Sequence, residues 1–424
     1  MTSELFSGAP GDWQTVRLRD VATFGSGTTP SRTRQEDYFT YGKHLWVKTL
    51  DLNNSVIRAT QEKVTDLALE DTSLKIYPES TVLVAMYGGY QQIGRTGILS
   101  APASVNQAIT AVIADQRKMI PAYLLHALNY RVGYWRSVAS SSRKDPNITG
   151  SDVKDFPVLL PSTSEQEIIA EAVSDVDRFI IQLERLIAKK RAISQGMRQQ
   201  LLTGKVRLPG FNDPWHEILL GNHVNYLRTV ALSRAQLDDE SPVRYLHYGD
   251  IHTRCGVTLD AAYEPMPRAN TTLLRNAGRL QVGDLVFADA SEDPDGVGKS
   301  VEVTSAPEAG VVPGLHTIAA RFDKSVLADG FKAYLQFIPV FRSSLLRLAS
   351  GTKVLAITRS FISSITLTLP SLDEQRAIAS AITDADQEIN ILLIRLTKAR
   401  ELKQGMMQQL LPGRTRLPLK EGAA

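Results

Sequence analysis

Residues 160–209 read LPSTSEQEIIAEAVSDVDRFIIQLERLIAKKRAISQGMRQQLLTGKVRLP, and residues 369–418 read LPSLDEQRAIASAITDADQEINILLIRLTKARELKQGMMQQLLPGRTRLP. Both segments contain 50 residues, and they align without a gap at an offset of 209 with 25 identical positions. Such agreement does not arise from composition, so the sequence contains an internal duplication. We call each copy a shared segment.

The apolar residues of each shared segment predict a long helix with a coiled-coil seam. Their spacing alternates between four and three, which is the 3.5-residue period of such a seam. In the first copy the seam comprises Ile169, Val173, Val176, Ile180, Leu183, Ile187, Met197 and Leu201, and Lys190 and Ser194 fill the same register between Ile187 and Met197. In the second copy it comprises Ile378, Ile382, Ala385, Ile389, Leu392, Leu396, Ala399, Met406 and Leu410, and Lys403 fills the same register between Ala399 and Met406.

Residues that start and stop helices stand at both ends of each predicted helix. Ser162 and Ser371 are each followed three residues later by a glutamate, which predicts a capping box. Gly204 and Gly413 predict the C-terminal ends. A helix of about 38 residues is roughly 57 Å long and needs a partner for its seam. We expect the two copies to pair antiparallel with pseudo-two-fold symmetry; the alternative is that each helix covers only the core of its own domain.

Each predicted helix also contains an internal glycine, Gly196 in the first copy and Gly405 in the second. A glycine inside a helix costs about 1 kcal/mol relative to alanine. Close packing of another chain at these positions would explain both glycines, as would a kink in the helix.

Fainter echoes extend the duplication into the regions before the shared segments. WQTVRL at 13–18 resembles WHEILL at 215–220, and STVLVA from Ser80 resembles GDLVFA from Gly283. Short β-branched runs alternate there with turn residues and a few helical stretches, which indicates α+β domains, each with a compact sheet. The expected order is a domain at 1–159, a helix at 160–209, a second domain at 210–368, and a helix with a tail at 369–424.

Composition excludes several classes of protein. The 424 residues are 43% hydrophobic and 22% charged, which suffices for sizeable cores and excludes a mostly disordered chain. The single cysteine, Cys255, excludes internal disulfides and cysteine-based zinc sites. No secretory signal and no apolar run of about 18 residues is present, so we expect a soluble cytoplasmic protein.

The net charge is only +3, so contact with nucleic acid requires local basic patches. Basic residues recur near the end of each domain, at Arg131, Arg136, Arg143 and Lys144 and at Arg342, Arg347, Lys353 and Arg359. This recurrence favours phosphate contact over a merely solvated charged face. Because 1–150 carries a net charge of +3 and 213–368 one of −2, we expect the second domain to depend more on directed contacts.

No catalytic constellation is visible in the sequence. Gly298-Lys299-Ser300 resembles the end of a phosphate-binding loop, but Asp293 occupies the position of the required first glycine. The seven histidines are scattered and lack the spacing of zinc ligands. We therefore expect a non-catalytic chain with no metal site and no cofactor of its own.

Two diverged domains, each ending in LP-x3-EQ, a helix with QGM-x-QQLL and then G-[KR]-x-RLP, resemble the specificity (S) subunit of a Type I restriction–modification system. The resemblance covers essentially the whole chain. It implies that the variable regions are target recognition domains, each reading one half of a split, asymmetric DNA site, and that the helices act as spacers. The implied partners are double-stranded DNA, two modification subunits that bind S-adenosylmethionine and methylate adenine, and up to two restriction subunits that use ATP and Mg. No membrane is implied.

The resemblance also points to DNA-reading residues in the loops of both domains. In the first domain they are Tyr87, Tyr90, Gln91, Gln92, Arg95, Asn106, Gln107, Arg143 and Lys144. In the second domain they are Ser291, Lys299, His316, Thr352 and Lys353. The Asn-Gln pair is replaced by Leu315-His316 in the second domain, and in the first it could equally be structural, capping the next strand.

Two competing interpretations predict different behaviour. A protein-binding coiled-coil adapter would assemble with partners but lack sequence-specific, salt-sensitive DNA binding. A self-contained methyltransferase would transfer methyl groups without any partner. The motifs of amino-methyltransferases are missing from the sequence, which argues against the second of these.

Overall fold

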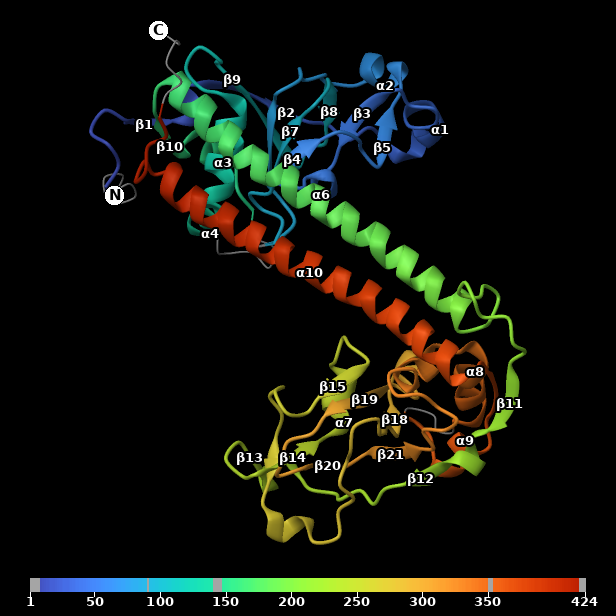
Figure 1. Cartoon of the computed structure of the whole chain (residues 1–424). Helices are drawn as coiled ribbons and strands as arrows, with labels where there is room; N and C mark the ends of the chain where they lie inside the picture. Colours follow the sequence, from blue (N-terminus) through green and yellow to red (C-terminus); the bar gives the residue numbers. More distant parts are fainter. Residues whose placement is uncertain (1–7, 90, 140–146, 350–353, 419–424) are drawn as a thin grey trace. The chain divides into compact units, whose positions relative to one another are not determined.

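The computed structural model describes residues 8–89, 91–139, 147–349 and 354–418, and the chain divides into two compact units (Figure 1). Unit 1 comprises residues 1–185 and 393–424, and unit 2 comprises residues 186–392. The division cuts two long helices, α6 (Thr163–Leu201) and α10 (Leu372–Leu410). Each unit therefore contains one variable region, part of α6 and part of α10.

The main sheet of unit 1 has five strands in the order β2-β9-β6-β7-β4. All residues of the inner strand β6 (Val82–Ala85, VLVA) are buried, as expected for an apolar run covered on both faces. Neighbouring strands are antiparallel except the pair of β4 and β7, which is parallel. The other four strands are β2 (Ala22–Ser26), β4 (Ser55–Ile57), β7 (Thr96–Leu99) and β9 (Ile109–Ala114).

Smaller elements complete unit 1. A second sheet has the order β5-β3-β8, and a separate antiparallel pair joins β1 to β10. These strands are β1 (Gln14–Arg17), β3 (His44–Val47), β5 (Glu62–Val64), β8 (Ala103–Val105) and β10 (Pro157–Leu160). The helices are α1 (Gln35–Tyr38), α2 (Asp66–Asp71), α3 (Pro121–Tyr130), α4 (Gly133–Val138) and α5 (Gly150–Lys154). Figure 1 shows α3 beside α6, where the His126 imidazole Nε2 lies 3.0 Å from the Ser174 hydroxyl.

Unit 2 repeats this topology although its sequence has diverged. Its main sheet has the order β12-β21-β17-β19-β15, again with a parallel pair, β15 and β19, at one edge. A second sheet has the order β13-β16-β14-β20, and β11 pairs with β23 as β1 does with β10. The main-sheet strands are β12 (Val224–Tyr226), β15 (Thr258–Asp260), β17 (Leu285–Ala288), β19 (Ser300–Ser305) and β21 (Thr317–Phe322). The same strand order in both units identifies the variable regions as copies of one α+β fold.

The remaining elements of unit 2 lie in its second sheet, in the β11–β23 pair, in a further antiparallel pair of β18 with β22, and in its helices. The strands are β11 (His216–Leu219), β13 (Leu237–Asp238), β14 (Val243–Leu246), β16 (Arg268–Ala269), β18 (Ala290–Ser291), β20 (Val311–Pro313), β22 (Leu355–Ala356) and β23 (Thr366–Leu369). The helices are α7 (Tyr248–His252), the 3-10 helix η9 (Lys332–Phe337), α8 (Pro339–Leu348) and α9 (Arg359–Ser363).

The two long helices run antiparallel within each unit. In unit 1 Glu184 of α6 pairs with Arg400 of α10 at 2.7 Å, and Asp177, one heptad earlier, pairs with Lys403 at 2.6 Å. Lower residue numbers on α6 thus meet higher numbers on α10. Most of the predicted seam is buried along both helices, with Val173 and Ile382 fully inaccessible to solvent, whereas Val176, Met197, Ala385 and Met406 are partly buried. The structure confirms the paired helices, and the alternative in which each helix covers only its own domain is wrong.

The helix beginnings are fixed to the domains by a buried glutamine in each copy. Gln166 donates to the carbonyls of Lys118 and Pro161 and accepts from the Ile120 amide. Gln375, at the equivalent position, donates to Val326 and Pro370 and accepts from Ala328. Both side chains are at most 1% exposed. These bonds fix where each helix leaves its domain.

The predicted helix signals are largely confirmed. Ser162 and Glu165 form the capping box, because the Glu165 carboxylate accepts from the Ser162 amide and its own amide donates to the Ser162 hydroxyl. In the second copy, Glu374 instead accepts from Arg207. Gly204 and Gly413 adopt positive φ angles of 68° and 74° just after the helices, which favours glycine there. Both helices continue through their internal glycines.

Candidate nucleic-acid interface

The loop after β6 places four predicted readers of the first domain together. Tyr87 is 44% exposed, and Gly88 and Gly89 turn the chain behind it with φ angles of 113° and 76°. The Arg95 guanidinium donates to the Gln92 carboxamide at 2.9 Å. Gln91 is exposed on the same loop, whereas Tyr90 lies outside the described residues. The loop therefore offers a phenol, carboxamides and a guanidinium, the groups that read base edges and phosphates.

Asn106 and Gln107 differ in their surroundings: the first is bonded within a turn, and the second faces solvent. The Asn106 carboxamide oxygen accepts from the Ala108 amide at 3.2 Å, which forms a turn leading into β9. Gln107 is exposed to solvent. The side-chain oxygen of Asn106 thus has the structural role that was the alternative to DNA contact. Arg143 and Lys144 lie outside the described residues.

Both described readers in the equivalent loop of the second domain make internal hydrogen bonds. The Ser291 hydroxyl is buried, donates to the Asp293 carbonyl and accepts from the Asp293 amide. The Lys299 ammonium donates to the carbonyls of His252 and Arg254 at 2.6 and 2.8 Å. These contacts shape the loop and link it to the end of α7. Thr352 and Lys353 lie outside the described residues.

His316 lies immediately before β21 at a backbone φ of 55°, which is uncommon for a residue other than glycine. Its Nδ1 atom is 3.2 Å from the Asp289 carboxylate, and its side chain is 52% exposed. The ring also meets the Tyr248 ring edge to face, with centroids 5.4 Å apart. His316 is therefore exposed but held by two neighbours.

The predicted basic run of the first domain has mixed roles. Arg131 donates to the Pro157 carbonyl at 2.6 Å and lies over the Phe156 ring, and burial lowers the pKa of its guanidinium. It therefore contributes to packing. Arg136, five residues later on α4, is exposed.

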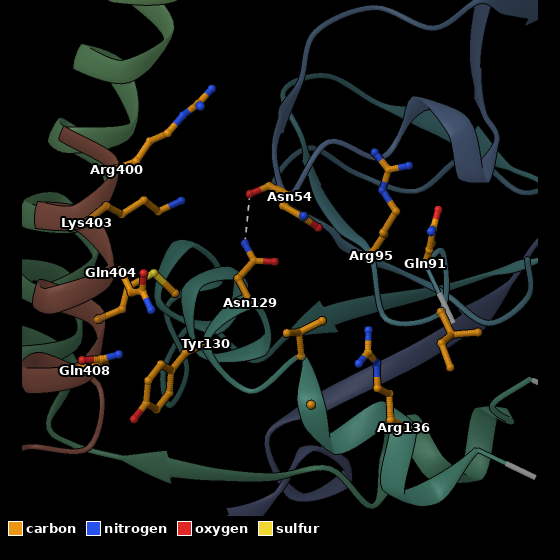
Figure 2. A pocket seen from close by; sticks show the side chains of 14 residues that line it. Asn54, Gln91, Arg95, Asn129, Tyr130, Arg136, Arg400, Lys403, Gln404 and Gln408 are labelled. Carbon is orange, nitrogen blue, oxygen red and sulfur yellow. Dashed lines mark hydrogen bonds between the residues drawn. The ribbon is translucent and has the colours of Figure 1, made fainter. Parts of the chain in front are cut away.

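The sequence did not reveal a cavity of about 770 Å³ in unit 1, beside the loop that carries Gln91 and Arg95. Figure 2 shows Arg400 and Lys403 extending from α10 toward this space, with Arg95 and Arg136 on its other side. Asn129 Nδ2 donates to the Asn54 carbonyl at 2.9 Å across its wall. The lining residues come from segments more than 250 residues apart, so no local pattern announces the cavity.

The same face of the shared segment lines a cavity of about 620 Å³ in unit 2. The helix residues that line this cavity are each 209 positions before a residue lining the first cavity; they are Arg191, Ser194, Gln195, Arg198 and Gln199.

In the described part of the chain, no group of three or more His, Cys, Asp or Glu side chains could hold a metal ion. No helix there is long and apolar enough to cross a membrane.

Comparisons with known proteins agree with this architecture. Residues 10–194 match the family described as the Type I restriction modification DNA specificity domain. The putative type I restriction enzyme MjaX specificity subunit of Methanocaldococcus jannaschii is 22% identical, over 96% of this chain and 95% of that protein. The MjaIX specificity subunit of the same organism is 27% identical over 40% of this chain and 39% of its own length. The crystal structure of the S subunit from M. genitalium has the same fold, with a TM-score of 0.61 and 14% identity, over 96% of this chain and 97% of that one.

Proposed function

Because residues 10–194 match the Type I restriction modification DNA specificity domain and nearly the whole chain is similar to a specificity subunit, we propose that the chain is a specificity subunit that recognises a DNA target composed of two different half-sites. The observation that carries the proposal is the repeated topology with diverged loops. The loop after β6 presents Tyr87, Gln91 and Arg95, whereas the loop after β17 holds Ser291 and Lys299 inward. Two similar folds with different reading loops read two different half-sites, which makes the target asymmetric.

We infer that the exposed apolar positions of the long helices dock the modification subunits. In unit 2, α6 exposes Ile193 by 54%, and in unit 1, α10 exposes its equivalent Leu402 by 57%. Gly196 and Gly405 lie three residues further along, and a Cβ at either would meet nothing within 4 Å. A glycine beside an exposed apolar residue leaves room for the backbone of another helix. One such surface in each unit supports two modification subunits per chain.

The proposed chemistry belongs to those partners. The family's specificity subunits are the non-catalytic component, so S-adenosylmethionine would bind the modification subunits. ATP and Mg would bind up to two restriction subunits. A complex that methylates cellular DNA works in the cytoplasm of a microbial cell, which is the location we propose.

Methylome sequencing tests the proposal directly. Cells expressing this chain with its modification subunit are compared with cells lacking only this chain. The expected result is a split motif with N6-methyladenine on both strands, present only with this chain. The variant Gln91→Ala/Arg95→Ala should change or abolish recognition of one half of that motif. Absence of any motif, with an assembled complex, would support the protein-binding adapter.

A further inference from the structure

The cavity in unit 1 brings cations from both parts of the fold to one place. Arg95 and Arg136 come from the recognition domain, and Arg400 and Lys403 come from α10. Among the described residues that line the cavity, none is an aspartate or glutamate. Asn, Gln and Tyr side chains supply the other polar groups (Figure 2). This composition suits an anionic ligand that accepts hydrogen bonds.

Two of these four cations remain available to a ligand although carboxylates lie nearby. Arg400 pairs with Glu184, but both side chains are about half exposed, at 61% and 45%, so solvent weakens the pair. Lys403 is held by Asp177 at 2.6 Å. Arg136 has no ion pair in the described part of the chain and is exposed. Arg136 and Arg400 are therefore the two cations most available to a ligand.

The location of the cavity identifies the anion. Gln91 and Arg95 belong both to the cavity wall and to the loop that we assign to base reading. In unit 2, the cavity lined by α6 shares Arg198, Phe337 and Arg342 with a neighbouring one that includes Ser291 and Lys299. In both units the helix face thus adjoins the reading loop. A duplex whose bases meet that loop would bring its backbone to these cations.

We propose that each cavity binds the sugar–phosphate backbone of the DNA read by the adjacent loop, through Arg136 and Arg400 in unit 1 and through Arg191 in unit 2. This inference rests on the proposed function and adds a role to the shared segments, which then hold DNA as well as pairing with each other. Phosphate contacts position a protein on the duplex without reading sequence. The helices would therefore strengthen binding to every sequence alike.

We expect the cavity of unit 2 to attract phosphate less strongly than the cavity of unit 1. Arg342 donates to the Asp295 carboxylate at 2.8 Å, and Arg198 is paired with Asp386. Arg191, the equivalent of Arg400, is exposed. We expect unit 1 to supply most of the phosphate attraction, in line with the more positive charge of its recognition domain.

The test uses the complex of this chain with its modification subunit. Binding to a duplex carrying the methylated motif and to a scrambled duplex is measured over a range of salt concentrations. Arg136→Glu/Arg400→Glu should weaken both by roughly tenfold or more near 0.15 M salt and reduce the salt slope by about 2, because each lost phosphate contact removes about 0.9. The neutral variant Arg136→Gln/Arg400→Gln should show a smaller loss in the same direction.

The matched control is Arg117→Glu/Arg178→Glu, which changes net charge equally at two exposed, ion-paired arginines of unit 1 outside the cavity. Equal affinities and slopes for the cavity variant and this control overturn the inference. Loss of the modification subunit with unchanged DNA affinity also overturns it and identifies an acidic protein surface as the occupant. If the wild-type complex binds both duplexes equally, the proposed function fails, while the scrambled duplex still reports on the cavity.

Discussion

Arg207 and Glu374 form an ion pair in unit 2, with Nη2 of the arginine 2.6 Å from Oε2 of the glutamate. The arginine ends the first shared segment and the glutamate begins the second. The equivalent residues of the opposite copies, Arg416 and Glu165, form the same pair in unit 1. The end of each shared segment is therefore joined by an ion pair to the start of the other, once in each unit.

Removing the Glu374 carboxylate should destabilise unit 2. Glu374 is 1% exposed and also accepts from the Trp215 indole at 3.2 Å, so Glu374→Ala leaves that indole and the Arg207 Nε atom without their acceptor, while Arg207 Nη2 keeps its bond to the Asp213 carbonyl. We expect a loss of about 2 kcal/mol, because buried donors without partners cost roughly 1–3 kcal/mol each and Arg207 can turn to solvent. Denaturant unfolding of the complex measures this loss. Glu167→Ala, an exposed glutamate on α6, should change stability by less than about 0.5 kcal/mol.

Gln166 offers a sharper test of how the helix is fixed to its domain. Gln166→Leu removes three hydrogen bonds to backbone groups of Lys118, Ile120 and Pro161. We expect a loss of about 3 kcal/mol or more, since buried backbone groups then lack partners. Gln182→Leu, at an exposed position of the same helix, is the control. Equal unfolding midpoints for the two variants would show that these bonds contribute nothing net.

The paired helices could be predicted because their signals are local. The seam from Ile169 to Leu201 follows a fixed period, and Ser162 and Gly204 mark the ends within one turn of the helix. Such patterns depend on neighbours three or four residues away. The duplication then supplied the partner, because an unpaired seam requires one.

The loops could not be predicted in the same way, because their contacts join distant segments. Lys299 remains a predicted DNA contact, but nothing in the sequence indicated that its ammonium binds carbonyls of residues 252 and 254, more than 40 positions earlier. The cavity combines Arg136 with Arg400, which no spacing rule relates. The echoes at STVLVA and GDLVFA predicted related domains, but the strand order of their sheets could not be read from the diverged sequences, because many apolar residues fit the same buried strand.

His126 should make unit 1 sensitive to acid. Burial, with a smaller contribution from Lys403, lowers its pKa from 6.5 to about 4. The side chain faces Ser174, Asp177 and Lys403. Because the unfolded chain binds the proton more tightly, keeping His126 neutral in the folded state contributes to the free energy of unfolding. This contribution is fully present above pH 6.5 and is lost as the pH falls toward 4, by up to about 3 kcal/mol. His126→Phe should flatten this dependence in hydrogen-exchange measurements resolved by unit. An unchanged acid slope would contradict the assignment.

Glu302 should give unit 2 the opposite dependence. Its carboxyl is 1% exposed and accepts from the amides of Gly330 and Ala333, with Lys332 3.9 Å away and Asp329 beyond it. Burial raises its pKa from 4.5 to about 7. The folded state therefore holds the Glu302 proton more tightly than the unfolded chain does. The resulting contribution to the free energy of unfolding is fully present below pH 4.5 and is lost as the pH rises through 7, by up to about 3 kcal/mol.

Unit-resolved hydrogen exchange between pH 4.5 and 7.5 tests this sign, with Glu302→Gln as the variant that cannot titrate. The wild-type unit 2 should exchange faster as pH rises, after correction for the intrinsic exchange rate, and Glu302→Gln should show no such trend. Wild-type protection that is constant or rises with pH would mean that Lys332 and the two amides hold Glu302 ionised in the folded state. The same measurement on unit 1 is the internal control, because His126 predicts stability that increases over the lower part of this range.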